Sequence, residues 1–95
     1  MRVVVVGSAG RMGSAVCRAV DADQDLELAA AVDPSSAGSE DPTGTVNVVK
    51  ALEDVDASTV DVMVDFTIAE AARSNIAWCA ANQVHAVVGT SGLND

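Results

Sequence analysis

Residues 3–13, Val-Val-Val-Val-Gly-Ser-Ala-Gly-Arg-Met-Gly, constrain the fold more than any other part of the chain. The run of valines predicts a buried strand that ends at Gly7. Gly10 and Gly13 follow at three-residue steps, so the chain is expected to turn tightly and reopen as a helix from Arg11. The first N–H groups of a helix and the positive end of its dipole bind phosphate or pyrophosphate. The stretch therefore predicts a phosphate-binding strand–turn–helix.

Each glycine has its own expected part in this turn. Gly7 allows the tight turn, Gly10 lets a ligand approach the backbone, and Gly13 lets the helix pack closely on the strand. The spacing G-x-x-G-x-x-G differs from the usual G-x-G-x-x-G, so a glycine-rich turn that binds nothing stays open as an alternative. Apolar residues at helical spacing predict the buried face of the helix. They are Met12, Ala15, Val16, Ala19 and Val20.

A second apolar run, Leu26 to Val32, predicts the next strand and ends in an acid, Asp33. Asp33 lies 20 residues after Gly13. Dinucleotide-binding folds place an acid at the tip of their second strand, where it accepts hydrogen bonds from the adenosine ribose. The order of strand, glycine turn, helix, strand and acid therefore favours a dinucleotide site. Residues 34–45 are rich in turn formers and predict a loop.

The rest of the chain predicts further short elements. Residues 46–49 are expected to be extended, 50–55 to form a brief helix, and 60–66 and 84–88 to form the third and fourth strands. A second helix is expected from Thr67 to about residue 81, before Asn82-Gln83.

The second helix carries a predicted cap and a predicted buried face. Thr67-Ile-Ala-Glu70 has the form of a capping box, in which the hydroxyl caps the first turn and Glu70 reaches back. Trp78 lies off the apolar stripe and is expected to be partly exposed. The stripe consists of Ile68, Ala72, Ile76, Cys79 and Ala80.

The order β-α-β-loop-β-α-β predicts an α/β fold. With right-handed crossovers the strands are parallel, and the sheet is Rossmann-like and doubly wound, though incomplete at the C-terminus. Residues 1–95 are expected to be one NAD(P)-binding domain, or its N-terminal part. The strands lead into Gly7, Asp33, Phe66-Thr67 and Gly89-Thr90-Ser91, which are expected at one edge of the sheet.

Composition narrows the function classes. Hydrophobic residues make up 49% of the chain and aromatic residues only 2%, which suits alanine-rich helices on a valine-rich parallel sheet. The net charge of −9 argues against nucleic acid or an anionic membrane as partner, because both need a basic face. No stretch is apolar enough to span a bilayer and no secretory signal is present, so a cytoplasmic location is expected.

The cysteines and the histidine indicate no metal or redox site. Cys17 and Cys79 are isolated, each on an expected helix, and are expected to be small buried residues. His85 is the only histidine and falls at the start of an expected strand. No metal ligand and no catalytic residue is therefore predicted in this chain.

Three ordered motifs resemble a known family. They are Val-Gly-Ser-Ala-Gly-Arg-Met-Gly at 6–13, Val-Asp-Phe-Thr at 64–67 and His-Ala-Val-Val-Gly-Thr-Ser-Gly at 85–92. The chain is similar to the N-terminal domain of the 4-hydroxy-tetrahydrodipicolinate reductases, formerly called dihydrodipicolinate reductases. Members of this family usually read G-x-x-G-R-M-G, D-F-T and V-V-G-T-T-G at these places. The match covers the chain apart from the 34–45 loop.

The resemblance implies an activity and a set of cofactor contacts. The family reduces a cyclic imine-type intermediate with NADH or NADPH in the diaminopimelate route to lysine. By position, the resemblance implies that the glycine turn holds the pyrophosphate and that Asp33 binds the adenosine ribose. It further implies that Phe66 and Thr67 border the nicotinamide ribose region and that residues 89–91 contact the nicotinamide half. Ser91 replaces the usual Thr and keeps the hydroxyl. The implied cofactor contacts are Gly7, Ser8, Ala9, Gly10, Arg11, Met12, Asp33, Phe66, Thr67, Gly89, Thr90 and Ser91.

Cofactor choice follows from the acid. Asp33 favours the free ribose hydroxyls of NADH and repels the 2′-phosphate of NADPH. Some relatives add an arginine directly after the acid to accommodate NADPH, whereas Pro34, Ser35 and Ser36 follow here. NADH is therefore expected to be preferred, with NADPH possible through the serine hydroxyls.

The resemblance also implies what this chain lacks. In the family the catalytic histidine pair and lysine, the substrate loop and most of the tetramer interface lie in a second domain. The chain ends at Asp95, so it is expected to bind cofactor without catalysis, with a homotetramer expected only for the full-length family member.

Two alternatives share the fold. One is a stand-alone nucleotide- or CoA-binding module, which needs no catalytic domain. The other is a different Rossmann oxidoreductase, such as a homoserine or sugar dehydrogenase. The ending Gly-Thr-Ser-Gly favours the reductase.

Overall fold

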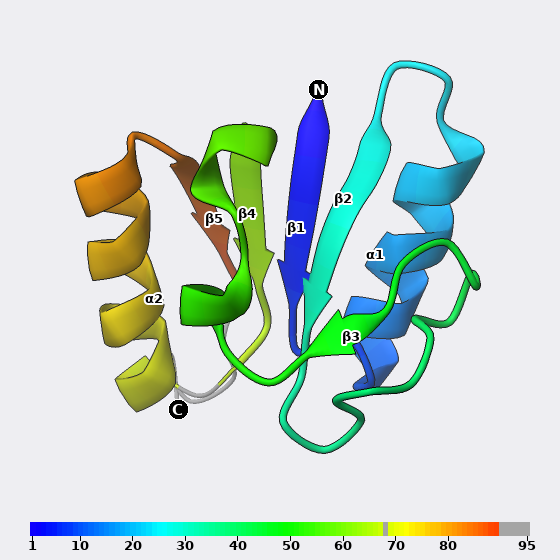
Figure 1. The fold of residues 1–95 in the computed structure, drawn as a ribbon, viewed down its shortest axis with the longest axis horizontal. Helices are drawn as coiled ribbons and strands as arrows, with labels where there is room; N and C mark the ends of the chain where they lie inside the picture. Colours follow the sequence, from blue (N-terminus) through cyan, green and yellow to red (C-terminus); the bar gives the residue numbers. More distant parts are fainter. Residues whose placement is uncertain (68, 90–95) are drawn as a thin grey trace.

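The computed structural model describes residues 1–67 and 69–89, with side chains given for 1–67 and 71–89. Five parallel strands form one sheet in the order β3-β2-β1-β4-β5 (Figure 1). The strands are β1 (Arg2–Val6), β2 (Glu27–Val32), β3 (Val48–Val49), β4 (Val62–Asp65) and β5 (His85–Val88). The helices are α1 (Arg11–Ala22), α2 (Ala69–Asn82) and the short 3₁₀ turns η1 (Leu52–Asp54) and η2 (Ala57–Thr59).

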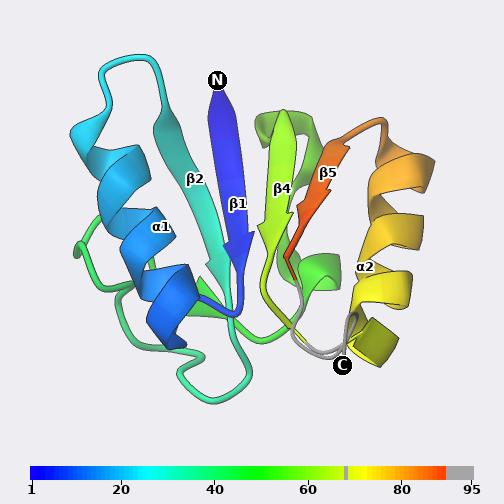
Figure 2. The ribbon, with the colours of Figure 1, turned by 180° about the vertical axis from the view of Figure 1, so that it is seen from behind.

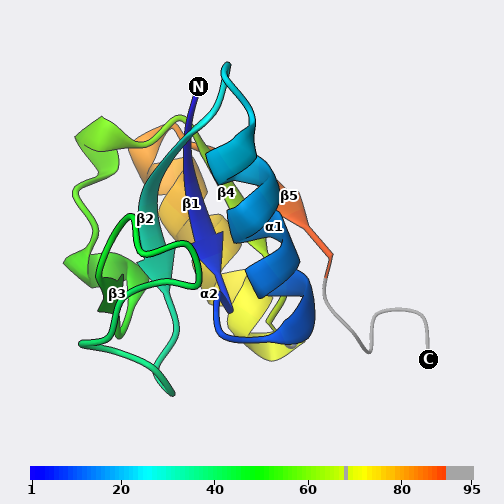
Figure 3. The same ribbon diagram turned by 90° about the vertical axis from the view of Figure 1, so that its right-hand side faces the viewer.

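The pleat of β1 divides the core into two halves. Val3 and Val5 face the cluster that contains Cys17 and Val20 of α1. Val4 and Val6 face the opposite cluster, which contains Cys79 of α2 together with residues of η1, β4 and the chain before β5. The helices therefore cover opposite faces, and the predicted doubly wound parallel sheet is confirmed. Figure 2 shows α1 beside β2 and α2 beside β5, and Figure 3 shows α1 and the β3–η1 segment on opposite sides of the sheet.

Helix α1 begins at Arg11 as predicted, and Val20 of its predicted buried face is confirmed, but most of the other residues assigned to that face are wrong. Its buried residues are Gly13, Cys17 and Val20. Met12 is 60% exposed. Ala15 and Ala19 are exposed as well, and Val16 is half-buried. The reason is the close approach of Gly13 to the Gly7 turn, which rotates the helix so that the 13–17–20 row faces the sheet.

Helix α2 follows its prediction in part. Ala72 and Cys79 are buried and Trp78 is half-buried, as expected. Ile76 is 43% exposed. Ala80 is exposed too, so both were wrongly assigned to the buried face. Because α2 packs on β4 and on the edge strand β5, only a narrow row of its side chains is covered. The predicted residues Ile68 and Glu70 lie outside the side chains that the structure describes.

The connection from β2 to β3 contains a loop at 34–45, as predicted, and a buried carboxylate, Asp41, organises its interior. Asp41 is 4% exposed and accepts hydrogen bonds from the N–H groups of Thr43, Thr45 and Val46 and from the Thr43 hydroxyl. The Thr45 hydroxyl donates to Asp21 of α1 at 3.0 Å. Burial raises the pKa of Asp41, but these hydrogen bonds outweigh it and leave the pKa lowered. The loop is thereby tied to α1.

Past this loop the elements are shorter than predicted. The extended segment 46–49 narrows to β3, and η1 occupies the middle of the predicted 50–55 helix. The turn η2 was not predicted, although Asp56 caps it by accepting from Ser58 N. The predicted third strand, 60–66, is β4, and the fourth, 84–88, is β5.

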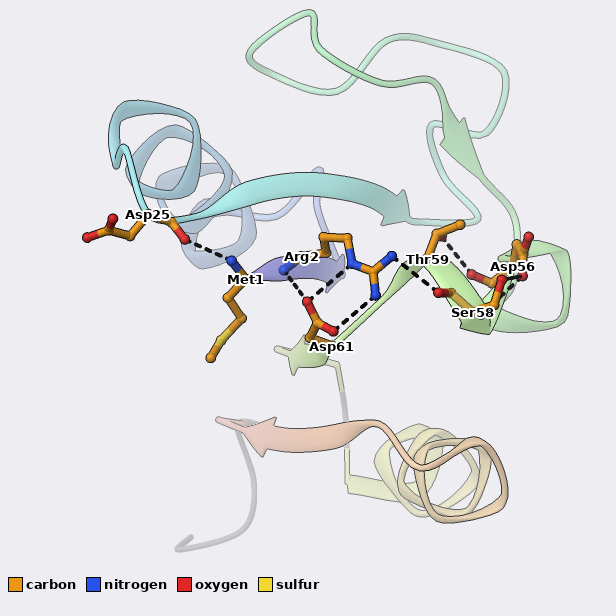
Figure 4. Close-up of polar contacts among 7 residues, drawn as sticks. All are labelled: Met1, Arg2, Asp25, Asp56, Ser58, Thr59 and Asp61. Atoms are coloured by element: carbon orange, nitrogen blue, oxygen red, sulfur yellow. Dashed lines mark hydrogen bonds and ion pairs between the residues drawn. The ribbon is translucent and has the colours of Figure 1, made fainter.

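An ion pair between Arg2 and Asp61 lies at the edge of the sheet where the strands begin (Figure 4). The Arg2 guanidinium donates to both Asp61 carboxylate oxygens, at 3.2 and 3.1 Å, and the Arg2 backbone N–H donates at 2.7 Å. Arg2 also donates to the Ser58 carbonyl oxygen at 3.2 Å. These hydrogen bonds, led by the Arg2 side chain, lower the pKa of Asp61 to about 2. The contacts join β1 to the segment that enters β4.

The β4–β5 side of the sheet is less covered than the β1–β2 side. Val62 and Val64 share the α1 face with Val3 and Val5 but are only half-buried. Val87, paired with Val64, is 56% exposed.

Neither α1 nor α2, the two α-helices within the described residues, has the length and apolar character needed to cross a membrane.

Candidate functional site

The carboxyl ends of the strands bring the predicted residues to one edge of the sheet (Figure 2). Gly7 follows β1, Asp33 follows β2, Phe66 and Thr67 follow β4, and Gly89 follows β5. All strands are parallel, so these ends lie together. Of the residues assigned to the cofactor, Thr90 and Ser91 lie outside the described part of the chain.

The glycine turn has the geometry that its sequence predicts at Gly7 and Gly13. Gly7 has φ +83°, which side chains rarely adopt, and its N–H donates to the Val32 carbonyl oxygen at 2.7 Å. A Cβ on Gly13 would lie 2.0 Å from the Gly7 carbonyl oxygen, so only glycine fits. At Gly10 an added Cβ would meet only that same oxygen, at 3.4 Å. Its expected part in admitting a ligand stays a prediction.

The start of α1 offers hydrogen-bond donors to the edge of the sheet. Gly10 is the N-cap and has no side chain to accept from the first turn. The first turn also contains no acidic residue, which leaves the dipole uncompensated there. Arg11 and Met12 are exposed beside these donors. The arrangement suits an anion.

Asp33 joins the glycine turn to the next strand. One carboxylate oxygen accepts from the Ala9 N–H at 2.9 Å. The other accepts from the Ser35 N–H at 3.0 Å and the Ser35 hydroxyl at 2.7 Å. Burial raises the pKa of Asp33, but the hydrogen bonds from Ser35 and Ala9 outweigh it and leave the pKa lowered. Asp33 is therefore an anionic acceptor held directly against the glycine turn.

Ser8 differs from its neighbours in the turn. Its side chain is fully buried, and its hydroxyl has no hydrogen-bond partner within the part of the chain that the structure describes. The Ser8 carbonyl oxygen accepts from the Ser14 hydroxyl at 3.1 Å. The Ser8 N–H donates to the Val32 carbonyl oxygen at 3.4 Å, and the whole residue is buried. A contact of Ser8 with a cofactor stays a prediction.

The segment after β4 is positioned by a buried carboxylate that the sequence reasoning missed as a site residue. Asp65 is fully buried, and one of its oxygens accepts from the N–H of Thr67 at 2.8 Å and from the Thr67 hydroxyl at 2.6 Å. The other oxygen accepts from the Asn75 amide nitrogen of α2 at 2.8 Å. The motif Asp-Phe-Thr signalled a functional segment but did not reveal Asn75 as the partner.

This segment lies against both neighbouring turns. A Cβ on Gly7 would come within 3.6 Å of the Phe66 carbonyl carbon and 3.7 Å of the Thr67 methyl group. The Gly89 N–H donates to the Asp65 carbonyl oxygen at 2.8 Å. The Phe66 ring packs so closely on Gly89 that an added Cβ would lie 3.2 Å from it. The structure thus brings the predicted residues 7, 66, 67 and 89 together.

A small pocket of about 160 Å³ opens at this edge. Its apolar wall includes Val6, Val32 and Pro34, and its polar groups include Lys50 and Asn75. Lys50 was also missed. It follows β3, whose Val49 pairs with Val32, and the register of β2 and β3 therefore places it next to Asp33 at the edge. Lys50 and Asp33 are neighbours because β3 pairs with β2, and no pattern along the sequence predicts this pairing.

The cysteines do not form part of this site. Burial raises the pKa of Cys17 to about 11 and also raises that of Cys79, so both thiols stay protonated at neutral pH. Both are buried, as predicted. Among the described residues no group of His, Cys, Asp and Glu side chains could hold a metal ion.

The sequence of this chain is similar to known proteins along its whole length. The sequence model of the family described as "Dihydrodipicolinate reductase, N-terminus" matches residues 1–95. The chain belongs to this family. It is 41% identical over 95 residues to a 4-hydroxy-tetrahydrodipicolinate reductase of Cutibacterium acnes, covering all of this chain and 32% of that protein. It is 38% identical over 107 residues to the reductase of Methanobrevibacter smithii, covering all of this chain and 39% of that protein.

A solved structure supports the same assignment. The dipicolinate-bound dihydrodipicolinate reductase from Paenisporosarcina sp. TG-14 superposes with a TM-score of 0.79 at 29% identity. The alignment covers 100% of this chain and 39% of that one. The chain thus has the fold of the N-terminal region of the reductase family and spans between about a third and two fifths of the length of these relatives.

Proposed function

We propose that this chain is the dinucleotide-binding part of an NAD(P)H-dependent 4-hydroxy-tetrahydrodipicolinate reductase. The observation that carries the proposal is the junction of Asp33 with Ala9, because it places a ribose acceptor directly against a phosphate-binding turn. The proposed reaction is the reduction of 4-hydroxy-tetrahydrodipicolinate to tetrahydrodipicolinate, in the diaminopimelate route to lysine. The chain by itself binds the cofactor without catalysis.

The proposed binding mode follows the strand ends. The turn of residues 7–12 contacts the pyrophosphate at the start of α1. The N–H groups of Arg11 and Met12 are the proposed donors, because those of residues 7–10 donate to oxygens within the chain. Asp33 accepts from the adenosine ribose hydroxyls. The nicotinamide half lies toward Phe66, Thr67 and the residues that follow β5, which are Gly89, Thr90 and Ser91. When bound, the cofactor supplies the hydride.

NADH is the proposed preferred cofactor. The pKa of Asp33 is lowered, so its carboxylate is charged at neutral pH and repels a 2′-phosphate. Ser35 donates both its N–H and its hydroxyl to the Asp33 carboxylate, so neither donor is available to the 2′-phosphate of NADPH. NADPH is expected to bind more weakly than NADH.

The proposal extends to compartment and assembly. A cytoplasmic location fits a biosynthetic reductase, and the net charge of −9 gives no basic surface for nucleic acid or anionic lipid. The homotetramer is proposed only for the full-length family member.

The test is a parallel calorimetric titration of the chain with NADH, NADPH and CoA. We expect NADH to bind most tightly and Asp33→Ala to weaken it by about tenfold or more, the loss of a charge-assisted hydrogen bond. Asp25→Ala is the matched control, since Asp25 is exposed before β2 and its side chain is removed with the same change in net charge. Tighter binding of CoA, or an NADH affinity indifferent to Asp33, would contradict the proposal and favour a stand-alone CoA module.

A further inference from the structure

The pocket at the carboxyl edge lies beside the proposed ribose site. Its wall includes Val32 and Pro34, the two residues that flank Asp33. A ribose held by Asp33 carries its base one bond away, so the base is directed at the nearest concave apolar surface. At about 160 Å³ the pocket is smaller than the ~300 Å³ of the smallest usual ligand sites, so it suits one flat moiety and not a whole ligand.

Asn75 contributes a polar group from α2 to the same pocket. It is half-buried, and its amide nitrogen donates to Asp65 at 2.8 Å. A carboxylate oxygen accepts hydrogen bonds, so the amide must turn its nitrogen to Asp65 and its oxygen away. Asp65 is itself fixed by two hydrogen bonds from Thr67, which holds this orientation.

The Asn75 amide oxygen is therefore an acceptor with a set direction. Within the described residues no donor reaches this oxygen, while the nitrogen of the same amide is taken. An acceptor in a largely apolar pocket recognises a ligand N–H and disfavours a ligand oxygen at the same place.

We propose that the Asn75 amide oxygen accepts a hydrogen bond from the 6-amino group of adenine in the bound dinucleotide and thereby selects adenine over hypoxanthine. This rests on the dinucleotide site proposed above. Hypoxanthine has an oxygen at the 6-position, which would face the Asn75 oxygen with no proton between them. Asp65 acts on this choice only through Asn75, as a positioning residue.

The test compares NADH with its hypoxanthine analogue, deamino-NADH, by calorimetry on the unaltered chain and on Asn75→Ala. The unaltered chain is expected to bind NADH about tenfold more tightly than deamino-NADH, the usual effect of setting acceptor against acceptor. In Asn75→Ala the ratio of the two dissociation constants is expected to fall to about one. A purely structural part for Asn75 would weaken both ligands and leave their ratio unchanged.

Asn82→Ala is the matched control. Asn82 lies at the end of the same helix, is exposed, and donates its amide to the Trp78 carbonyl oxygen at 2.8 Å. The control is expected to keep the tenfold ratio. Circular dichroism checks that both variants fold. If Asn75→Ala does not fold, the ratio of the two dissociation constants in the unaltered chain tests the proposal, and a ratio of about one contradicts it.

Three outcomes would overturn the inference. They are equal affinities of the unaltered chain for both ligands, a preserved ratio in folded Asn75→Ala, and a lost ratio in Asn82→Ala. If neither dinucleotide binds the folded chain, the proposed function itself fails. The two failures are thereby distinguished.

Discussion

The two halves of the carboxyl edge are built differently. On the β1–β2 side the glycine turn, Asp33 and the loop around Asp41 are tied to one another and to α1 by hydrogen bonds within the chain. On the β4–β5 side one buried group, Asp65, holds the Phe66–Thr67 segment and α2, and the neighbouring Val87 is 56% exposed. The first half is closed by its own contacts, whereas side-chain hydrogen bonds from the Phe66–Thr67 segment and from α2 converge on Asp65, which acts as a tether. Binding by this chain is therefore expected to come mainly from the adenosine half.

The largest effect is expected at the contact that closes the β1–β2 half. Gly13→Ala places a Cβ 2.0 Å from the Gly7 carbonyl oxygen, and backbone must move to relieve the clash. We expect a loss of about 3 kcal/mol or more in the free energy of unfolding, measured by urea denaturation. Gly10→Ala, whose Cβ meets that oxygen only at 3.4 Å, is the control and should lose far less. Equal unfolding midpoints for the two variants would refute the proposed packing of α1 on the turn.

The tether of the β4–β5 half comes next. Asp65→Ala leaves the Thr67 N–H, the Thr67 hydroxyl and the Asn75 amide without their shared acceptor. Because the acceptor that these half-buried donors share is itself fully buried, we expect a loss of about 3 kcal/mol in the free energy of unfolding. Asp56→Ala is the comparison, because Asp56 likewise accepts from a hydroxyl and an N–H, both of Ser58, but on the exposed turn η2. It should lose about 1 kcal/mol or less. A similar loss in both variants would mean that burial does not set the strength of the tether.

A ligand-side prediction sharpens the contrast directly. ADP-ribose lacks the nicotinamide, and the described contacts of the site cluster on the adenosine half. We therefore expect this chain to bind ADP-ribose within about threefold of NADH, a difference of less than 1 kcal/mol. Competition calorimetry measures the ratio. A preference for NADH of thirtyfold or more would show that contacts to the nicotinamide contribute more to binding than expected.

The smallest effect is expected at the opposite edge, at the Arg2–Asp61 pair. The Arg2 hydrogen bond lowers the pKa of Asp61 from 3.8 to about 2. Because the folded pKa lies below the unfolded value, the pair stabilises the fold above about pH 4, and this contribution is lost as the pH falls toward 2. Both side chains are more than two fifths exposed, so the effect is modest.

Urea denaturation of the unaltered chain and of Asp61→Asn between pH 7 and pH 2.5 measures this contribution. The two unfolding midpoints should differ at pH 7 and converge at low pH. Binding of NADH at pH 7 should be the same in both, since Arg2 and Asp61 lie where β1 and β4 begin, at the opposite edge of the sheet from the proposed site. A constant difference across the pH range would exclude the pair as its source.

Local patterns predicted much of the fold. The valine run, the glycine steps and the acid 20 residues after Gly13 each follow from short-range geometry, and the parallel sheet follows from their order. The same patterns failed for the helix faces: Met12 and Ile76 are exposed although their spacing marked them as buried. Hydrophobic periodicity locates a helix, but the neighbour on which it packs decides which row is covered.

By itself the sequence determined the strand–turn–helix, the glycine positions that admit no side chain, and the acid that follows β2. Only the tertiary structure decided which groups meet. Asp33 with Ala9 and Asp65 with Asn75 are pairs separated along the chain that the tertiary structure joins by hydrogen bonds. The register of β2 and β3 likewise places the backbone of Lys50 next to that of Asp33. A hydrogen bond depends on distance and direction in space. The distance and direction of these hydrogen bonds are set only when the strands pair, so no pattern of residues along the chain predicts them.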